Sequence, residues 1–366
     1  MESIWKSNRI IYVDILRILS ILAVIVLHIT ADLLTRTNDF DTSSWWVSNI
    51  FNSVSRFAVP VFFMISGAMM LRVNITTYRD FYIKRVLPLV IALVSWSLIY
   101  ALYNQYVIVN SKMNALAFLQ DFGYKLLTDG NYVHLWFLYA IIAIYMTIPL
   151  ISKLVKTCSE KDLRYYLSWW AAISIGYRFI SDIIVKLTGQ YINIPLLNIP
   201  LFTGFLGYFI LGHYLFTYGL PDKWKQVLFN LGIVSFFLTP VATYFASRHL
   251  GILDETFYGN YSITTFFMAV AMFIWFKEKE PTLHERVNYK LQKMIGSISK
   301  ASFSIYLIHL LIELLVSRRA ETEASLLQTS SNLVFNVIAV FTVSYLLVKM
   351  LNLSKVMTTV LFGGKG

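Results

Sequence analysis

The sequence has few charged residues and almost no cysteine. Asp, Glu, Lys and Arg make up only 14% of the 366 residues, whereas 57% are hydrophobic. Soluble domains carry about 25% charged residues, so this chain lacks the polar groups that would cover a water-facing surface. Cys158 is the single cysteine, which excludes an internal disulfide. The composition therefore predicts an all-α integral membrane protein rather than two or three soluble domains.

The usual motifs of soluble enzymes are also missing. The chain has no glycine-rich phosphate loop, no set of His and Cys at metal-ligand spacing and no Gly-x-Ser-x-Gly elbow. The residues left to carry chemistry are the polar ones inside apolar stretches, which are costly in lipid and are functional candidates by default.

Ten apolar stretches are long enough, or nearly so, to cross a bilayer core, which takes roughly 20 residues. They are residues 10–33, 50–71, 86–108, 132–152, 165–187, 196–217, 226–246, 260–276, 301–316 and 332–352. The connections between them are short. We therefore expect one transmembrane domain over residues 1–366, a bundle of about ten helices with no separate soluble domain.

The distribution of Lys and Arg predicts the orientation. With the N-terminus in the cytoplasm, 21 of the 31 fall on the cytoplasmic side, 7 on the outer side and 3 within the spans. This excess follows the positive-inside rule and predicts that both termini are cytoplasmic. Topology and attraction to anionic membrane lipids account for the net charge of +11, so we expect no nucleic-acid partner.

The first stretch carries the most polar residues. Arg17 and His28 are eleven residues apart, which is three turns plus about 20°, so both project from one helix face, roughly 16 Å apart. Asp14 lies one turn before Arg17 and can pair with it. Asp14 and Arg17 are either an interfacial ion pair or part of a site. His28 either bonds a backbone carbonyl or acts in the chemistry.

The second stretch contains Arg56 and Pro60. Arg56 either snorkels to the outer headgroups or reaches the depth of His28. Pro60 removes a backbone hydrogen bond and predicts a kink. Ser66 and Gly67 are expected to allow close helix packing.

Four further sets of polar residues are candidates. His134 and Trp136 open the fourth stretch, where Trp136 is typical of a membrane-interface belt. Tyr306 and His309 share one face of the ninth stretch and are expected to form a buried hydrogen-bonded pair or to act in catalysis. Arg178 is a lone charge without an evident partner.

The loop containing Arg79, Lys84 and Arg85 shows either positive-inside bias alone or a surface for a polyanionic donor.

The order and spacing of these motifs resemble the acyltransferase-3 family over nearly the whole chain. This family consists of bacterial integral-membrane O-acyltransferases that modify surface polysaccharides, and the chain resembles its stand-alone, membrane-only type. The residues that carry the resemblance are Arg17, His28, Arg56, Phe57, Pro60–Phe63, Ser66, Gly67, Arg85, Pro88, His134–Trp136, Ser302, Tyr306 and His309. Where the family often has a second basic residue in the first stretch, this chain has Asp14.

The resemblance implies that acetyl-CoA is used from the cytoplasm as co-substrate, without a metal or prosthetic group. The acceptor is a hydroxyl of a surface or lipid-linked polysaccharide, and the protein lies in the bacterial inner membrane. Catalytic roles fall to His28, Arg17, Arg56, Tyr306 and His309, donor binding to Arg17, Arg79, Lys84 and Arg85, and acceptor binding to Arg56, His134 and Trp136. His28 is either a general base or a transient acyl carrier.

Two other functions remain open from the sequence. A transporter or exporter of glycans or small molecules also uses polar residues near the midplane and a proline-kinked helix. Against it, no inverted repeat is evident, and Asp14 is the only clear acidic residue that we expect within a span. A membrane sensory or partner module is the remaining alternative.

Overall fold

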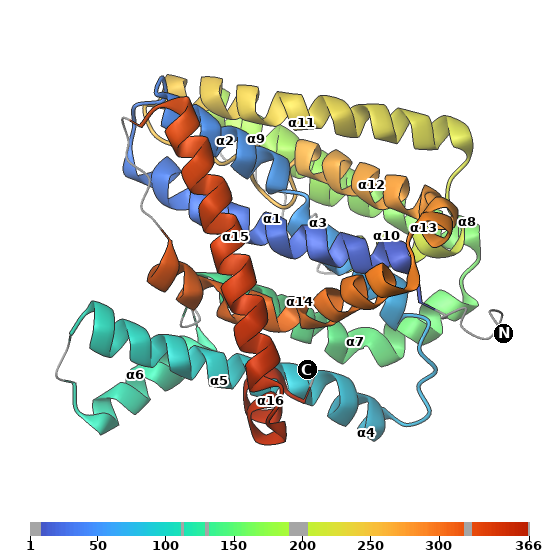
Figure 1. Ribbon diagram of the computed structural model, residues 1–366. Coiled ribbons are helices and arrows are strands. Elements are labelled where there is room, and N and C mark those ends of the chain that lie inside the picture. Colours follow the sequence, from blue (N-terminus) through green and yellow to red (C-terminus); the bar gives the residue numbers. More distant parts are fainter. Residues whose placement is uncertain (1–8, 111–112, 129–131, 190–203, 318–323, 365–366) are drawn as a thin grey trace.

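The computed structural model describes residues 9–110, 113–128, 132–189, 204–317 and 324–364, which form helices joined by loops (Figure 1). The α-helices are α1 (Ile11–Arg36), α2 (Ser43–Ser55), α3 (Ala58–Met70), α4 (Tyr78–Phe81), α5 (Leu87–Tyr103), α6 (Ala115–Leu127), α7 (Trp136–Thr157), α8 (Glu160–Trp170), α9 (Arg178–Thr188), α10 (Leu206–Thr217), α11 (Asp222–Leu250), α12 (Ile263–Glu278), α13 (Glu280–Arg286), α14 (Tyr289–Val316), α15 (Leu326–Leu351) and α16 (Lys355–Phe362). Short π- or 3-10-helical segments extend or join them: η1 (Tyr82–Val86), η2 (Asn104–Ile108), η3 (Val133–Leu135) and η4 (Ala171–Tyr177). The prediction of an all-α protein is confirmed for these ranges.

Seven helical segments in the described ranges are long and apolar enough to cross a membrane, so the chain is a multi-pass membrane protein. They are Ile11–Arg36, Ser43–Met70, Tyr78–Ile108, Val133–Thr157, Asp222–Leu250, Tyr289–Val316 and Leu326–Leu351. The other three predicted stretches contribute to α8–η4–α9, to α10 and to α12. Each of these segments is too short or not apolar enough to be counted with the seven. Part of the stretch 196–217, residues 196–203, lies outside the described residues. The total of ten spans stays a prediction.

Pro60 explains why the second span is broken. A proline has no N–H to donate to the carbonyl four residues earlier, which here belongs to Arg56. α2 ends at Ser55 and α3 begins at Ala58, so Arg56 and Phe57 form a junction between two helices. The predicted kink is confirmed. It places Arg56 at a helix break, where its side chain can turn into the bundle.

Two glycines allow the backbones of α3 and α10 to touch. A Cβ atom added to Gly67 would lie 1.7 Å from the carbonyl oxygen of Phe209, and one added to Gly212 would lie 1.9 Å from that of Met64. Helices approach this closely only through residues without side chains. The predicted packing role of Gly67 is therefore confirmed.

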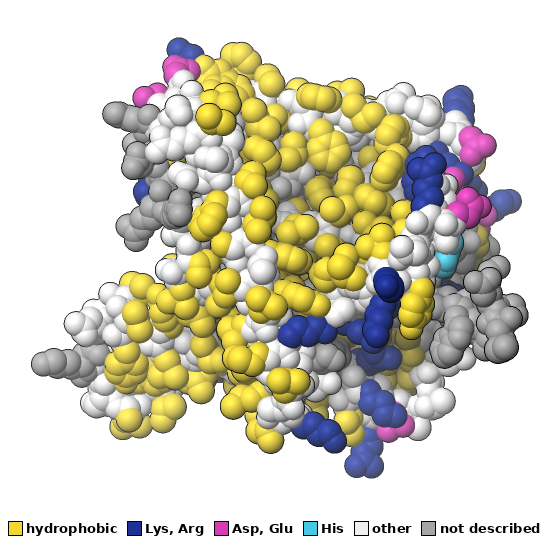
Figure 2. All heavy atoms as spheres, in the orientation of Figure 1, with side chains coloured by type: hydrophobic (Ala, Val, Ile, Leu, Met, Phe, Trp, Pro, Cys, Tyr) yellow, Lys and Arg dark blue, Asp and Glu magenta, His cyan; other side chains and the backbone are white. Residues whose placement is uncertain are grey.

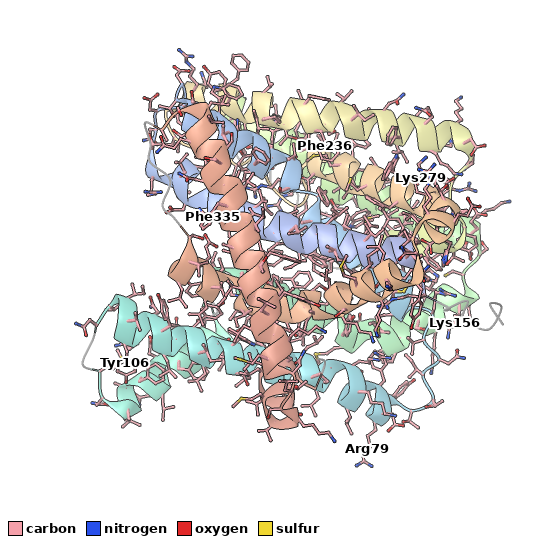
Figure 3. The ribbon with its side chains drawn as sticks, in the orientation of Figure 1. Arg79, Tyr106, Lys156, Phe236, Lys279 and Phe335 are labelled. Atoms are coloured by element: carbon pink, nitrogen blue, oxygen red, sulfur yellow. The ribbon has the colours of Figure 1, made fainter. Side chains whose placement is uncertain are left out.

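Lysine and arginine side chains gather at one end of the bundle, which we call the basic end (Figure 2). Lys156 and Lys279 lie at this end and Tyr106 at the opposite one (Figure 3). A broad hydrophobic surface separates the two ends in this view. This pattern is what the positive-inside rule leads one to expect, while the membrane side that each end faces stays a prediction.

α1 and α14 pack against each other and run in the same direction (Figure 1). Near the basic end, the Ser299 hydroxyl donates to Asp14 Oδ1 at 2.5 Å. Farther along, the rings of His28 and His309 lie with their centroids 5.2 Å apart. Between these two contacts α1 advances by 14 residues and α14 by 10, so the two helices stay side by side but shift by about one turn relative to each other.

Glu280 of α13 fixes the start of α1. Its carboxylate accepts the backbone N–H groups of Ile11 at 2.8 Å and Tyr12 at 2.6 Å. These N–H groups have no partner within their own helix, and the helix dipole also favours an anion here. The contact holds the first turn of α1 in place, and with it Asp14 and Arg17.

Candidate active site

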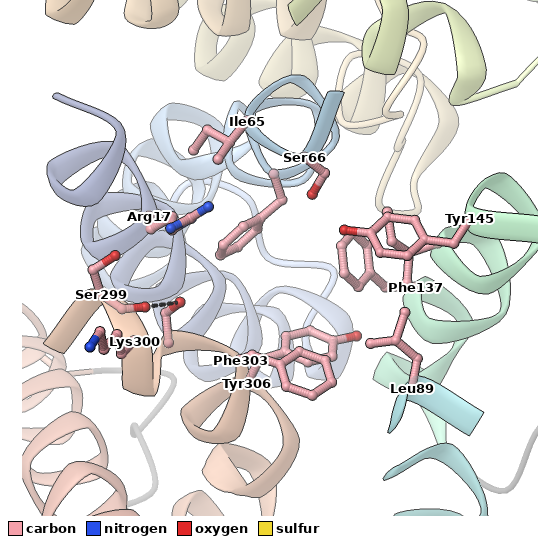
Figure 4. Close-up of a pocket in the computed structure, with 13 residues that line it drawn as sticks. Arg17, Ile65, Ser66, Leu89, Phe137, Tyr145, Ser299, Lys300, Phe303 and Tyr306 are labelled. Carbon is pink, nitrogen blue, oxygen red and sulfur yellow. Dashed lines mark hydrogen bonds between the residues drawn. The ribbon is translucent and has the colours of Figure 1, made fainter. Parts of the chain in front are cut away.

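A cavity of about 330 Å³ lies between α1, α3, α5, α7 and α14 (Figure 4). Its walls are largely apolar, and its polar lining consists of Arg17, Ser66, Tyr145, Ser299, Lys300, Ser302 and Tyr306. From Ser299 to Tyr306 the α14 lining advances by two turns, roughly 10 Å. The cavity thus leads from the residues near the basic end toward the middle of α14. Ser66, which we expected to serve packing, lines the cavity instead.

Arg17 and Lys300 are the cations of the lining. Asp14 lies closer to Arg9, whose Nε donates to Oδ2 at 2.5 Å, than to Arg17, whose guanidinium is 3.8 Å from Oδ1. Ser299 provides a further hydrogen bond to Asp14. The predicted Asp14–Arg17 pair is thus present but long, and Arg17 points into the cavity (Figure 4).

The other predicted donor-binding cations lie outside this lining. Arg79, Lys84 and Arg85 are exposed on α4 and η1. Lys84 lies 3.6 Å from Asp80, one turn earlier. Figure 3 shows Arg79 pointing away from the bundle. These three residues form a surface that a polyanion can approach, and only Arg17 of the predicted donor-binding set reaches the cavity.

Three histidines from separate apolar stretches come together in what we call the histidine cluster. The ring centroids of His28 and His309 are 5.2 Å apart, those of His134 and His309 5.4 Å, and those of His28 and His134 6.4 Å. The ring of Tyr306 lies 5.4 Å from that of His134 and also lines the cavity, so it connects the two. No group of three His, Cys, Asp or Glu among the described residues is arranged to hold a metal.

Tyr306 and His309 are buried and hydrogen-bonded, as one of the two alternatives expected, but the bond runs from the His309 ring to the Tyr306 backbone rather than between the two side chains. The Tyr306 hydroxyl donates to the backbone carbonyl of His134, and His309 Nδ1 lies 2.6 Å from the backbone carbonyl oxygen of Tyr306. Because a carbonyl only accepts, Nδ1 of His309 carries the hydrogen and Nε2 has a free lone pair. This Nε2 is buried and has no hydrogen-bond partner within the described residues.

Arg56 reaches the histidine cluster through Asn52. Its Nε donates to Asn52 Oδ1 at 2.8 Å, and Asn52 donates to the carbonyl of Leu27, the residue before His28, at 3.1 Å. The guanidinium also packs over the ring of Tyr258, 4.0 Å from its centroid. Burial raises the pKa of Tyr258, which lies in the loop before α12, to about 12, so its phenol is neutral at physiological pH. Arg56 is therefore held at the depth of His28 rather than snorkelling to the surface.

Trp136 and Arg178 lie away from the cluster. Trp136 is 40% exposed at the start of α7, with its ring 5.4 Å from that of Phe205. This exposure is consistent with the predicted interface belt. Arg178 packs over the ring of Tyr261 at 5.5 Å, which supplies the partner that the sequence did not reveal.

Sequence reasoning missed three charged residues. Lys300, which was not among the candidate site residues, lines the cavity. Asp32 and Glu313 lie on α1 and α14 within two of the membrane-crossing helices, so the expectation that Asp14 is the only acidic residue in a span is wrong. Their spacing was the available signal, because each follows a cluster histidine by four residues.

The arrangement provides the parts of a group-transfer site. Cations near the basic end can bind an anionic group, and a neutral imidazole can remove a proton from a hydroxyl. A fixed guanidinium at the same depth can stabilise a developing negative charge.

A family model described as an acyltransferase domain matches residues 10–349. No curated protein and no solved structure matches the chain. The matched range contains the cavity, the histidine cluster and Arg56. The chain therefore belongs to the acyltransferase-3 family and is a membrane acyltransferase.

Proposed function

We propose that this protein transfers an acetyl group from cytoplasmic acetyl-CoA to a hydroxyl of a surface or lipid-linked sugar, within the bacterial inner membrane. The observation that carries the proposal is the cavity that leads from Arg17 and Lys300 to Tyr306, beside the histidine cluster. Such a transfer requires cations at the entrance, which bind the anionic donor, and a group at the inner end that accepts a proton.

The donor enters from the basic end, which faces the cytoplasm in the proposed orientation. A polyanionic nucleotide cannot enter lipid, so it stays at the exposed surface of Arg79, Lys84 and Arg85. Its uncharged pantetheine arm extends into the apolar cavity past Arg17. The thioester thereby reaches the neighbourhood of Tyr306, while the acceptor comes from the opposite end.

The transfer itself needs one proton acceptor. A nitrogen of His28 takes the proton of the acceptor hydroxyl as its oxygen attacks the thioester carbonyl. The C–S bond breaks, and the thiolate of coenzyme A takes up a proton, which gives an O-acetyl ester and free thiol. Arg56, fixed at this depth, stabilises the negative charge on the carbonyl oxygen. Tyr306 positions His134, because its hydroxyl is already bonded to that backbone.

The test uses the purified protein in lipid nanodiscs with [¹⁴C]acetyl-CoA and de-O-acetylated glycan from its host. Alkali-labile label on the glycan supports the proposal. Label that stays on the protein at His28 when the glycan is omitted would replace the general base by an acyl carrier. Absence of transfer, together with loss of the glycan from the surface of a deletion strain, would instead support export.

A further inference from the structure

A buried asparagine lies between Arg56 and the turn of α1 that carries His28. The side chain of Asn52, in α2, is completely buried. Its Oδ1 atom accepts from Nε of Arg56 at 2.8 Å and from a terminal nitrogen of the same guanidinium at 2.5 Å. Its amide nitrogen donates to the Leu27 carbonyl at 3.1 Å and to the Thr30 hydroxyl at 2.8 Å. One side chain therefore joins Arg56 to residues on either side of His28.

The amide of Asn52 suits this position chemically. A guanidinium only donates hydrogen bonds, whereas the carbonyl of Leu27 only accepts them. The group between the two must accept on one side and donate on the other, and the two ends of an amide do this. Because all of these contacts are buried, a residue that lacks either end would leave one of the groups without its partner.

Arg56 has a second support in the loop before α12. Its Nη1 donates to the backbone carbonyl of Tyr258 at 3.2 Å, and the guanidinium lies over the Tyr258 ring. The Tyr258 hydroxyl donates to Oδ1 of Asn49, and the amide nitrogen of Asn49 donates to the Pro240 carbonyl of α11 at 2.9 Å. Tyr258 and Asn49 are both buried. The guanidinium is thus fixed at two points, by Asn52 and by Tyr258.

The partners of Arg56 among the described residues are all uncharged: an amide oxygen, a backbone carbonyl and an aromatic face. No carboxylate of the described ranges lies within 4.0 Å of the guanidinium, and Glu255, in the same loop as Tyr258, is exposed. A guanidinium has five N–H groups, and these contacts use three, which leaves one on each terminal nitrogen. The charge of Arg56 is therefore fixed in place but not neutralised.

We propose, on the basis of the proposed function, that Asn52 is a positioning residue for acyl transfer. It holds Arg56 beside the His28 turn without neutralising it. The guanidinium thereby keeps its full charge and two N–H groups for the negative oxygen that forms on the thioester carbon. A donor that is fixed in advance needs no reorganisation when this charge develops. A carboxylate at position 52 would also hold Arg56, but it would compete with the reacting oxygen for the guanidinium.

A double-mutant cycle tests whether Asn52 acts through Arg56. The kcat for acetyl transfer is measured in nanodiscs, with saturating acetyl-CoA and de-O-acetylated host glycan, at a temperature at which every variant is folded. Asn52→Ala should lower kcat about 10- to 100-fold, because a displaced donor loses much of its effect. Arg56→Met should lower kcat about 100- to 1000-fold, and the double variant should match Arg56→Met within about twofold. The Kd of acetyl-CoA should stay near wild type in Asn52→Ala.

Two outcomes of the cycle would overturn the proposal. The first is a wild-type kcat in Asn52→Ala. The second is a double variant in which the two losses multiply, because Asn52 would then act independently of Arg56.

Asn52→Asp separates the charge of residue 52 from its role in the fold. The new carboxylate can keep the bonds to Arg56, so the variant should melt near the wild-type temperature, whereas kcat should fall about tenfold because the guanidinium is already paired. Asn230→Asp, at an exposed position on α11, is the matched control and should keep the wild-type kcat. A wild-type kcat in Asn52→Asp would refute the need for a neutral partner. A clearly lower melting temperature would mean that the fold, rather than the charge of Arg56, requires the amide, which would also overturn the proposal.

The wild-type protein distinguishes this inference from the function on which it rests. If wild type transfers no acetyl group to any glycan, the proposed function fails and this inference fails with it. Transfer by wild type that is insensitive to Asn52 refutes only this inference.

Discussion

Replacement of Arg17 by methionine should weaken donor binding while leaving the fold nearly unchanged. Arg17 lies 3.8 Å from Asp14, which keeps its closer bonds to Arg9 and Ser299 at 2.5 Å each. An ion pair of this length, at a side chain that is 34% exposed, contributes less than about 1 kcal/mol to the free energy of unfolding. Methionine retains much of the apolar stem, so packing is largely preserved.

The effect on affinity should be larger. Hydrogen bonds to charged groups contribute about 1.5–3 kcal/mol. Because the Arg17 side chain is partly exposed, solvent screening favours the lower part of this range, roughly 1.5–2 kcal/mol. At about 1.4 kcal/mol for each factor of ten, Arg17→Met should raise the Kd of acetyl-CoA about 10- to 30-fold.

Isothermal titration calorimetry of acetyl-CoA against the protein in nanodiscs measures this Kd, and thermal melting of the same samples measures stability. The matched control is Arg36→Met, which removes an arginine near the other end of the same helix, where it pairs with Asp32 at 2.6 Å. Wild-type donor affinity in Arg17→Met, or equal weakening in both variants, would refute the assignment of Arg17 to the donor.

Two further substitutions test the packing and the cluster. Gly67→Ala should destabilise the protein by about 1–3 kcal/mol or more, because the new Cβ would overlap the Phe209 carbonyl; Gly123→Ala, where no atom lies within 4 Å of the added Cβ, should stabilise by about 0.5–1 kcal/mol in thermal melts. A Gly67→Ala variant as stable as wild type would contradict the close helix contact. Tyr306→Phe leaves the buried His134 carbonyl without its donor and should cost about 1–3 kcal/mol, with slower acetyl transfer but an unchanged Kd for acetyl-CoA. Wild-type stability in that variant would exclude the bond.

The sequence predicts best the features that a single helix determines. Arg17 and His28 were expected on one face of the first helix. In the structure Arg17 lines the cavity and His28 belongs to the histidine cluster. Pro60 predicted the break that places Arg56, because the missing N–H is a property of the residue itself. Such features need only the helical repeat and backbone chemistry.

Features that depend on packing between distant segments were not predictable. The histidine cluster joins residues 28, 134 and 309 through the packing of α1, η3 and α14, which the sequence pattern does not fix. The hydroxyl of Tyr306 bonds the backbone of His134 rather than His309 for the same reason. Glu313 could have been found from its i+4 spacing to His309, but only the structure shows that its Oε2 is buried without a hydrogen-bond partner among the described residues.

The most direct measurement compares surface glycans from cells that express wild type, His28→Ala or His249→Ala at matched membrane levels, and from a deletion strain. His249 is an exposed histidine in the last turn of α11, so it controls for loss of an imidazole as such. Mass spectrometry of alkali-labile acetyl groups should detect O-acetylation with wild type and His249→Ala, and none with His28→Ala or the deletion. Full O-acetylation with His28→Ala would contradict the account.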